Sequence, residues 1–89
     1  MKKIAVIGSG TMGLDIAQVF AKAGFDVVVR DITDKIIKAS EAKLNKDLNK
    51  LIAKGKLDEA DKMAITDKMT FTTDINAVAD ANLVIEAIV

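Results

Sequence analysis

Three glycines near the start of the chain are spaced so that a backbone turn could hold a diphosphate group. They occupy the first, third and sixth positions of the run Gly8-Ser9-Gly10-Thr11-Met12-Gly13. In this pattern the first glycine permits a tight turn, the second lets phosphate approach the backbone, and the third lets a helix pack closely on a strand. Backbone N–H groups at the start of that helix would point at the phosphates. The positive end of the helix dipole would stabilise the negative charge of the phosphates. The alternative is a tight strand-to-helix turn that binds nothing.

An acidic residue follows at the distance that a dinucleotide site requires. Asp31 comes after Gly8 at close to the spacing of roughly 20 residues expected for the acid that accepts hydrogen bonds from ribose hydroxyls. A carboxylate there would repel the extra phosphate of NADP, and the residues that follow, Ile32 and Thr33, are not basic. The pattern therefore favours NAD over NADP, the alternative being an aspartate that caps a loop.

A strand, a helix and a second strand must position these residues. The apolar run 3–7 predicts a buried parallel strand, residues 11–23 a helix that ends at a left-handed Gly24, and residues 25–30 a second strand. Apolar positions at helical spacing are expected to face the sheet: Met12, Ile16, Val19, Phe20 and Ala23.

A helical hairpin is predicted next. Residues 34–54 form a long helix with Asp34 as its N-cap and Gly55 at its end, and Asp58 caps a short helix over 59–68. One side of the long helix is apolar, through Ile37, Leu44, Leu48, Leu51 and Ile52.

The rest of the chain completes a small parallel sheet. Short strands are predicted over 70–72 and 83–89, with a brief helix over 75–79 capped by Asp74. The fold expected is α/β, a partial Rossmann-type doubly wound sheet in the order 3-2-1-4, with the helical hairpin between strands 2 and 3. Glu86, in the apolar last strand, faces either a site or a neighbouring element.

Composition limits the classes of function. The chain has 89 residues, enough for one small domain, and its 13 basic and 13 acidic side chains give net charge 0. Neither nucleic acid nor a membrane surface is therefore an expected partner. There is no cysteine for a disulfide or thiolate metal site, no signal-peptide pattern, and no apolar run of the roughly 20 residues that span a membrane. No metal site and a cytoplasmic location are expected.

The missing residue types also limit the chemistry. The chain contains no His, Cys, Tyr or Trp, so no histidine base, thiol nucleophile or tyrosine acid can come from it. We assign no catalytic residue within it. Catalysis would need a cofactor, a carboxylate, a lysine or another chain.

A stripe of lysines follows one side of the long helix, at spacings that bring them together. It could hold an anionic substrate, but the acids Glu41 and Asp47 lie among them, which favours an ordinary solvated face. The lysines are Lys43, Lys46, Lys50 and Lys54.

Together these features resemble the N-terminal part of the 3-hydroxyacyl-CoA dehydrogenase family, and most closely its bacterial short-chain members. The resemblance covers essentially all 89 residues. The glycine run is shared by many dehydrogenases. The hairpin around LNKLIAKGKLDEADK, followed by FTTDINAVADANLVIEAIV, is far more specific.

The resemblance implies a fold, a reaction and site residues. The fold is a dinucleotide-binding domain followed by a helical domain that dimerises. The reaction, part of fatty acid metabolism, is hydride transfer between NAD(H) and 3-hydroxyacyl-CoA or 3-oxoacyl-CoA, with short chains such as acetoacetyl-CoA. Lys54, assisted by Lys50, would contact the CoA moiety, and Asp31 the ribose. Further cofactor contacts are implied at Ser9, Thr11, Met12, Ala87 and Ile88.

The resemblance also has gaps. The family's catalytic His–Glu pair, its substrate-orienting Ser and Asn, and the acid after the fourth strand have no counterparts here. Residues 1–89 are thus expected to be the N-terminal portion of a dinucleotide-binding domain, without its remainder or the helical domain, and to be inactive alone. The open edge of the fourth strand is expected to cause self-association.

Two other functions stay open. One is a non-catalytic nucleotide-binding or oligomerisation module. The other is a related dehydrogenase of the 6-phosphogluconate or UDP-sugar type, against which the long hairpin argues.

Overall fold

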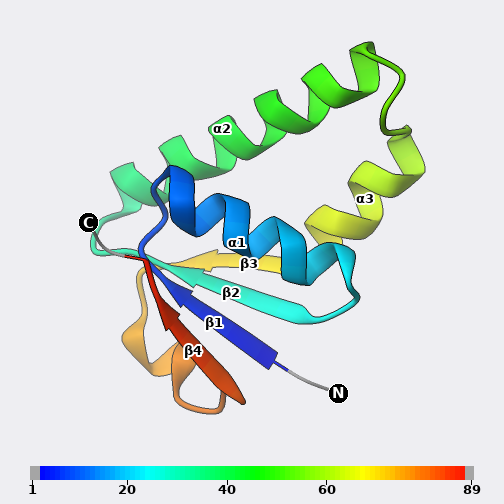
Figure 1. Ribbon diagram of the computed structural model, residues 1–89. Helices are drawn as coiled ribbons and strands as arrows, with labels where there is room; N and C mark the ends of the chain where they lie inside the picture. Colours follow the sequence, from blue (N-terminus) through cyan, green and yellow to red (C-terminus); the bar gives the residue numbers. More distant parts are fainter. Residues whose placement is uncertain (1–2, 88–89) are drawn as a thin grey trace.

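The computed structural model describes residues 3–87, which form a four-stranded parallel sheet with helices packed on it (Figure 1). The strands are β1 (Lys3–Ile7), β2 (Asp26–Arg30), β3 (Met69–Thr72) and β4 (Leu83–Glu86). All pairs are parallel and the order is β3-β2-β1-β4. The predicted α/β class and strand order are confirmed. After β1 the chain forms β2 and β3 on one side of β1, and β4 then pairs on its other side. A crevice is therefore expected at the carboxyl ends of β1 and β4, where the strand order reverses.

Three α-helices lie on one side of the sheet and a short 3₁₀ helix on the other (Figure 1). They are α1 (Thr11–Lys22), α2 (Asp34–Ala53), α3 (Glu59–Asp67) and the 3₁₀ helix η1 (Ile75–Val78). As predicted, α2 and α3 form a hairpin between β2 and β3. Gly24 and Gly55, with φ of 94° and 73°, follow α1 and α2 in the left-handed conformation that glycine adopts readily.

Several predicted boundaries shift by one residue, and β4, predicted over 83–89, ends at Glu86, residues 88–89 lying outside the described part of the chain. Two shifts at the start of an element have an identifiable cause. The N-cap of α2 is Thr33, not Asp34, since the Thr33 backbone is extended and its hydroxyl accepts a hydrogen bond from the Ile36 N–H at 3.2 Å. Asp34 is the first helical residue instead, where its negative charge interacts favourably with the positive end of the helix dipole. Likewise β2 begins at Asp26, because the Phe25 N–H bonds the Phe20 carbonyl and so belongs to the end of α1.

The core lies between the sheet and the three α-helices. Alternate strand residues share a sheet face, so Ile4 and Val6 of β1 line up with Val27 and Val29 of β2. These side chains are buried against the helices. The helical members of this core are Ala17, Ala21, Leu44, Leu48 and Ile65.

The face that α1 turns to the sheet agrees only in part with the predicted one. Met12 and Val19 are 57% and 65% exposed, Ala23 is exposed, and Ile16 and Phe20 are only partly buried. The buried positions are instead Gly13, Leu14, Ala17 and Ala21. The prediction holds for Ile16 and Phe20, which pack against the core, and was wrong for Met12, Val19 and Ala23 because it weighed hydrophobicity alone. The helix lies so close to the β1 turn that mainly small residues fit beneath it.

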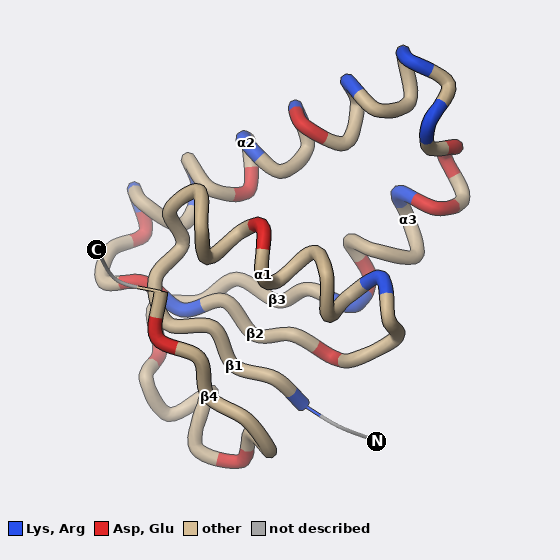
Figure 2. Tube along the Cα trace, viewed as in Figure 1, with Lys and Arg blue, Asp and Glu red and all other residues tan. Residues whose placement is uncertain are grey.

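Charged residues of both signs are distributed along the hairpin, and α2 carries several lysines (Figure 2). Its buried side holds Ile37, Leu44 and Leu48, as predicted, together with Ser40, which was not predicted. At the other end of the hairpin, the Asp58 side chain accepts the Asp61 N–H at 2.7 Å, confirming that cap.

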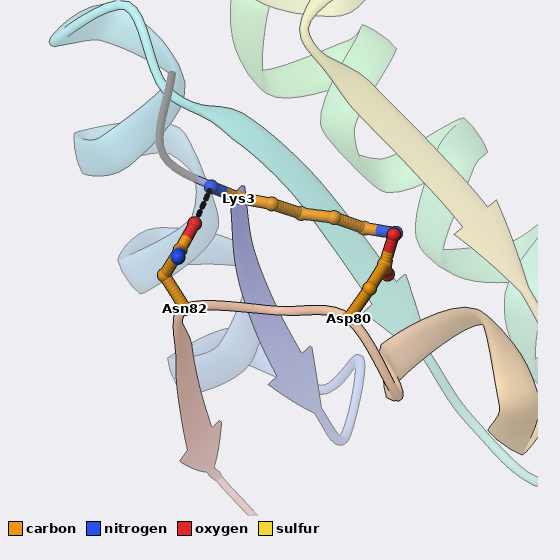
Figure 3. Close-up of polar contacts among 3 residues, drawn as sticks. All are labelled: Lys3, Asp80 and Asn82. Carbon is orange, nitrogen blue, oxygen red and sulfur yellow. Dashed lines mark hydrogen bonds and ion pairs between the residues drawn. The ribbon is translucent and has the colours of Figure 1, made fainter.

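Strand β4 is held beside β1 by contacts at its start (Figure 3). The Lys3 N–H donates to Asn82 Oδ1 at 2.9 Å, the Asn82 N–H donates to the Lys3 carbonyl at 2.8 Å, and the Lys3 ammonium pairs with Asp80 at 2.6 Å. These bonds fix the register of β4 and so the position of Ala87 beyond it.

Candidate cofactor site

The turn after β1 has the geometry that requires glycine at two places. Gly8 has φ of 104°, a conformation that residues with side chains rarely adopt, and its N–H donates to the Arg30 carbonyl at 2.8 Å. A Cβ atom on Gly13 would lie 1.9 Å from the Gly8 carbonyl oxygen. The first turn of α1 therefore rests directly on the turn, and a side chain at Gly13 would push it away.

The N-terminus of α1 is open toward the surface. Gly10 is the N-cap; no side chain among the described residues caps it, and the first turn carries no acid. A Cβ on Gly10 would meet nothing within 4 Å, so space lies in front of the backbone. Thr11 and Met12 follow as exposed residues of the first turn. The first backbone N–H groups of a helix have no partner within it, which makes this end suitable for an anion.

A cavity of about 270 Å³ lies at the carboxyl ends of β1, β2 and β4. It joins the glycine turn to the end of β2, at the crevice that the strand order predicts. Arg30 also bonds the Thr73 carbonyl through Nε at 3.1 Å. The lining residues are Ile7, Gly8, Gly10, Arg30, Asp31, Ile32 and Ala87.

The carboxylate of Asp31 is held by three hydrogen bonds. Its Oδ2 accepts from both the N–H and the hydroxyl of Ser9 at 2.8 Å, and its Oδ1 accepts from the Ile32 N–H at 2.7 Å. Partial burial raises the pKa of the carboxyl. The bonds from Ser9 and Ile32 and the nearby charge of Arg30 lower it by more, so the pKa lies below its ordinary value. Asp31 is thus an oriented anion beside the glycine turn.

Ser40 is the site residue that sequence reasoning missed. Its hydroxyl oxygen lies 2.8 Å from both the carbonyl and the hydroxyl oxygen of Ser9. A signal was available, since Ser40 stands at helical spacing between Ile37 and Leu44 and is a polar residue on an otherwise apolar face. Its place there implies that it bonds something buried.

Of the remaining residues predicted for the site, some line the cavity and others do not. The Ser9 side chain is buried and bonds Asp31, and Ser9 itself does not line the cavity. Ala87 is buried in the cavity lining, where its N–H bonds the Ile7 carbonyl at 2.8 Å. Ile88 lies outside the described residues. Glu86, at the end of β4, is exposed.

The lysines of α2 lie apart from this cavity. A shallow hollow of about 470 Å³ on α2 is lined by Lys43, Lys46 and Lys50, together with Asp47, which pairs with Lys43 at 2.9 Å. Lys54 is the C-cap of α2 and does not line it. The hydrogen bond and charge of Asp47 raise the pKa of Lys43.

Residues 3–87 contain neither a membrane-spanning helix nor a metal-binding cluster. None of the helices described there is long and apolar enough to cross a membrane. In the same part of the chain, no three His, Cys, Asp or Glu side chains gather as a metal site would need.

The sequence of this chain is similar to that of known NAD-binding domains. The family model for the 3-hydroxyacyl-CoA dehydrogenase NAD-binding domain matches residues 3–89. The 3-hydroxybutyryl-CoA dehydrogenase of Clostridioides difficile is 49% identical over 63 residues, which cover 71% of this chain and 22% of that protein. A probable 3-hydroxybutyryl-CoA dehydrogenase of Deinococcus radiodurans is 46% identical over 63 residues, covering 71% and 23%.

Solved structures of known proteins match the fold of this chain closely. Mycobacterium tuberculosis FadB2 matches with a TM-score of 0.95 at 37% identity, and the (S)-3-hydroxybutyryl-CoA dehydrogenase PaaH1 of Ralstonia eutropha with 0.93 at 35%. Each match covers 100% of this chain and 31% of that chain. The chain thus spans about a fifth to a third of the length of these relatives. With the family model covering nearly every residue and the glycine turn and Asp31 on one cavity, the chain belongs to the NAD-binding domain family of the 3-hydroxyacyl-CoA dehydrogenases.

Proposed function

We propose that residues 1–89 bind NAD and provide the N-terminal portion of the cofactor site of a 3-hydroxyacyl-CoA dehydrogenase. The observation that carries the proposal is the cavity at the ends of β1, β2 and β4, which brings Gly8, Gly10 and Asp31 together. These residues suit a dinucleotide, because a tight turn and an open helix N-terminus accept a diphosphate while a carboxylate accepts ribose hydroxyls.

Each residue has its own part in holding the cofactor. Gly10 leaves room for a phosphate against the backbone, and the N–H groups of Thr11 and Met12 would donate to it. Asp31 would accept a ribose hydroxyl and repel a 2′-phosphate, which favours NAD over NADP. Ala87 and Ile88 follow β4 and would lie beside the cofactor. When bound, NAD takes up or gives up the hydride of the reaction.

The proposed reaction of the whole enzyme is 3-hydroxyacyl-CoA + NAD⁺ ⇌ 3-oxoacyl-CoA + NADH + H⁺, with short acyl chains such as acetoacetyl-CoA. The hydroxyl proton needs a base whose pKa is near neutrality, and this chain has no histidine. The 89 residues alone are therefore proposed to bind the cofactor without turnover.

Acyl-CoA is the proposed small-molecule partner. Lys50 and Lys54 are proposed to contact the anionic CoA moiety. The lysine-lined hollow on α2, which includes Lys50 but not Lys54, supports this proposal. Self-association through the β4 edge and a cytoplasmic location stay predictions from the sequence.

The direct test is titration of NADH into the purified chain, followed by NADH fluorescence, with NADPH in parallel. The chain has no Trp or Tyr, so its own emission is low. We expect saturable NADH binding, weaker NADPH binding, and a loss of about tenfold or more in NADH affinity for Asp31→Ala, which removes charge-assisted hydrogen bonds. No saturation in a folded sample would contradict the proposal.

Acetoacetyl-CoA added to the same sample separates catalysis from binding. We expect no oxidation of NADH. Turnover by the pure chain would show that the reaction needs no histidine.

A further inference from the structure

A buried chain of hydrogen bonds joins the hairpin to the cofactor cavity. Ser40 on α2 bonds both oxygens of Ser9 in the glycine turn, and Ser9 bonds Asp31 at the end of β2, each at 2.8 Å. Ser40 is 6% exposed and Ser9 is 2% exposed. Three elements far apart in the sequence thus meet through two side chains screened from water.

The bonds in this chain have a direction. A carboxylate only accepts hydrogen bonds, whereas a serine hydroxyl has one proton to donate. The Ser9 proton therefore goes to Asp31, which leaves Ser9 Oγ to accept from Ser40. The single proton of Ser40 is shared among Ser9 Oγ, the Ser9 carbonyl and the Ile36 carbonyl, which lies 2.9 Å away. A hydroxyl that accepts one bond donates the next more strongly.

The arrangement also decides which oxygen of Asp31 is left for a ligand. A carboxylate offers about four acceptor positions. Both protein bonds to Oδ2 come from Ser9, and Oδ1 accepts one from Ile32. Oδ1 therefore keeps a position for a ribose hydroxyl, provided that Ser9 holds the carboxylate in this rotation.

We infer that Ser40 is a positioning residue for NAD: it fixes Ser9, and through Ser9 the Asp31 carboxylate, in the orientation that ribose binding requires. Ser40 does not line the cavity, so it acts without touching the cofactor. The inference rests on the proposed function and assigns to α2 a part in cofactor binding as well as in the hairpin.

The test compares Ser40→Ala with a matched control. Thr66→Ala is that control, because among the described residues the Thr66 hydroxyl bonds only the Lys62 and Met63 carbonyls within α3, at 3.1 and 3.2 Å, and Thr66 does not line the cavity. Two quantities are measured on each full chain: the NADH dissociation constant, and the pKa of the Asp31 carboxyl by NMR titration. The pKa does not depend on cofactor binding. Circular dichroism checks the fold.

For Ser40→Ala we expect about fivefold to tenfold weaker NADH binding, since a hydrogen bond to a buried group is lost, and an Asp31 pKa nearer its ordinary value. Thr66→Ala should change neither. If Ser40→Ala does not fold, the size-matched Ser40→Cys, whose thiol is a weak donor, replaces it.

The outcomes separate the two proposals. Unchanged NADH affinity and Asp31 pKa in the Ser40 variant would overturn the inference while leaving NAD binding intact. Failure of the wild type to bind NADH would overturn the proposed function. In that case an unchanged Asp31 pKa in the variant would overturn the link from Ser40 to Asp31, and a raised pKa would support it.

Discussion

At the scale of single residues, two glycines of the turn have different roles that substitution can separate. Gly13→Ala places a Cβ 1.9 Å from the Gly8 carbonyl oxygen, so α1 must move. We expect a loss of roughly 1–3 kcal/mol in the free energy of unfolding and no NADH binding. Gly10→Ala meets no protein atom within 4 Å. It should cost at most about 1 kcal/mol as an N-cap change, yet weaken NADH binding.

Thermal denaturation and NADH titration of both variants check this pair. Equal destabilisation by the two substitutions would mean that Gly13 is not the close contact described above.

The carboxylate of Asp31 predicts a dependence of stability on pH. Its pKa is lowered in the folded chain, so the ionised form stabilises the fold above its unfolded pKa of about 4. That contribution is lost as the pH falls through the folded pKa. In denaturant unfolding from pH 7 down to about 2, the stability difference between wild type and Asp31→Asn should therefore shrink. A difference that stays constant over this range would contradict the assignment.

At the scale of elements, the short helix α3 depends on its cap. It has only 9 residues, too few to be stable without packing and capping. Asp58→Ala removes the acceptor of the Asp61 N–H and should cost about 1 kcal/mol. Asp58→Asn keeps a side-chain oxygen and is the control, expected to cost far less. Urea unfolding of the three proteins measures the effect, and equal losses would show that the charge matters rather than the cap.

At the scale of the whole molecule, β4 offers an edge for association. Within residues 3–87 it pairs with β1 alone, and its Leu83 and Val84 are 46% and 45% exposed. Open apolar edges template pairing with other strands. We expect concentration-dependent self-association that Val84→Lys reduces. Met63→Lys, at an exposed apolar position on α3, is the control and should not reduce it.

Sedimentation velocity over a wide concentration range provides the measurement. A single monomeric species of the wild type at every concentration would contradict an associating edge.

By itself the sequence determined the elements and the site's main groups, because both depend on local chemistry. The period-2 and period-3.6 patterns, with Gly24, Gly55 and Asp58 at element ends, predicted the strands and helices to within a residue or two, except that β4 ends at Glu86 and not at residue 89. The spacing of Gly8, Gly13 and Asp31 is enough by itself to predict a dinucleotide site. The parallel strands β1 and β2 end at the same edge of the sheet, and there the structure brings Gly8 and Asp31 to one cavity.

Only the tertiary structure decided which face of α1 is buried and how Asp31 is held. Because Gly13 lies against the Gly8 carbonyl, α1 buries the side that carries its small residues and leaves Met12 exposed. A hydrophobicity pattern does not show how closely a helix approaches the turn before it. Ser40 meets Ser9 only because α2 crosses above the turn. Hydrogen bonds between residues 31 positions apart depend on packing, which no local pattern in the chain records.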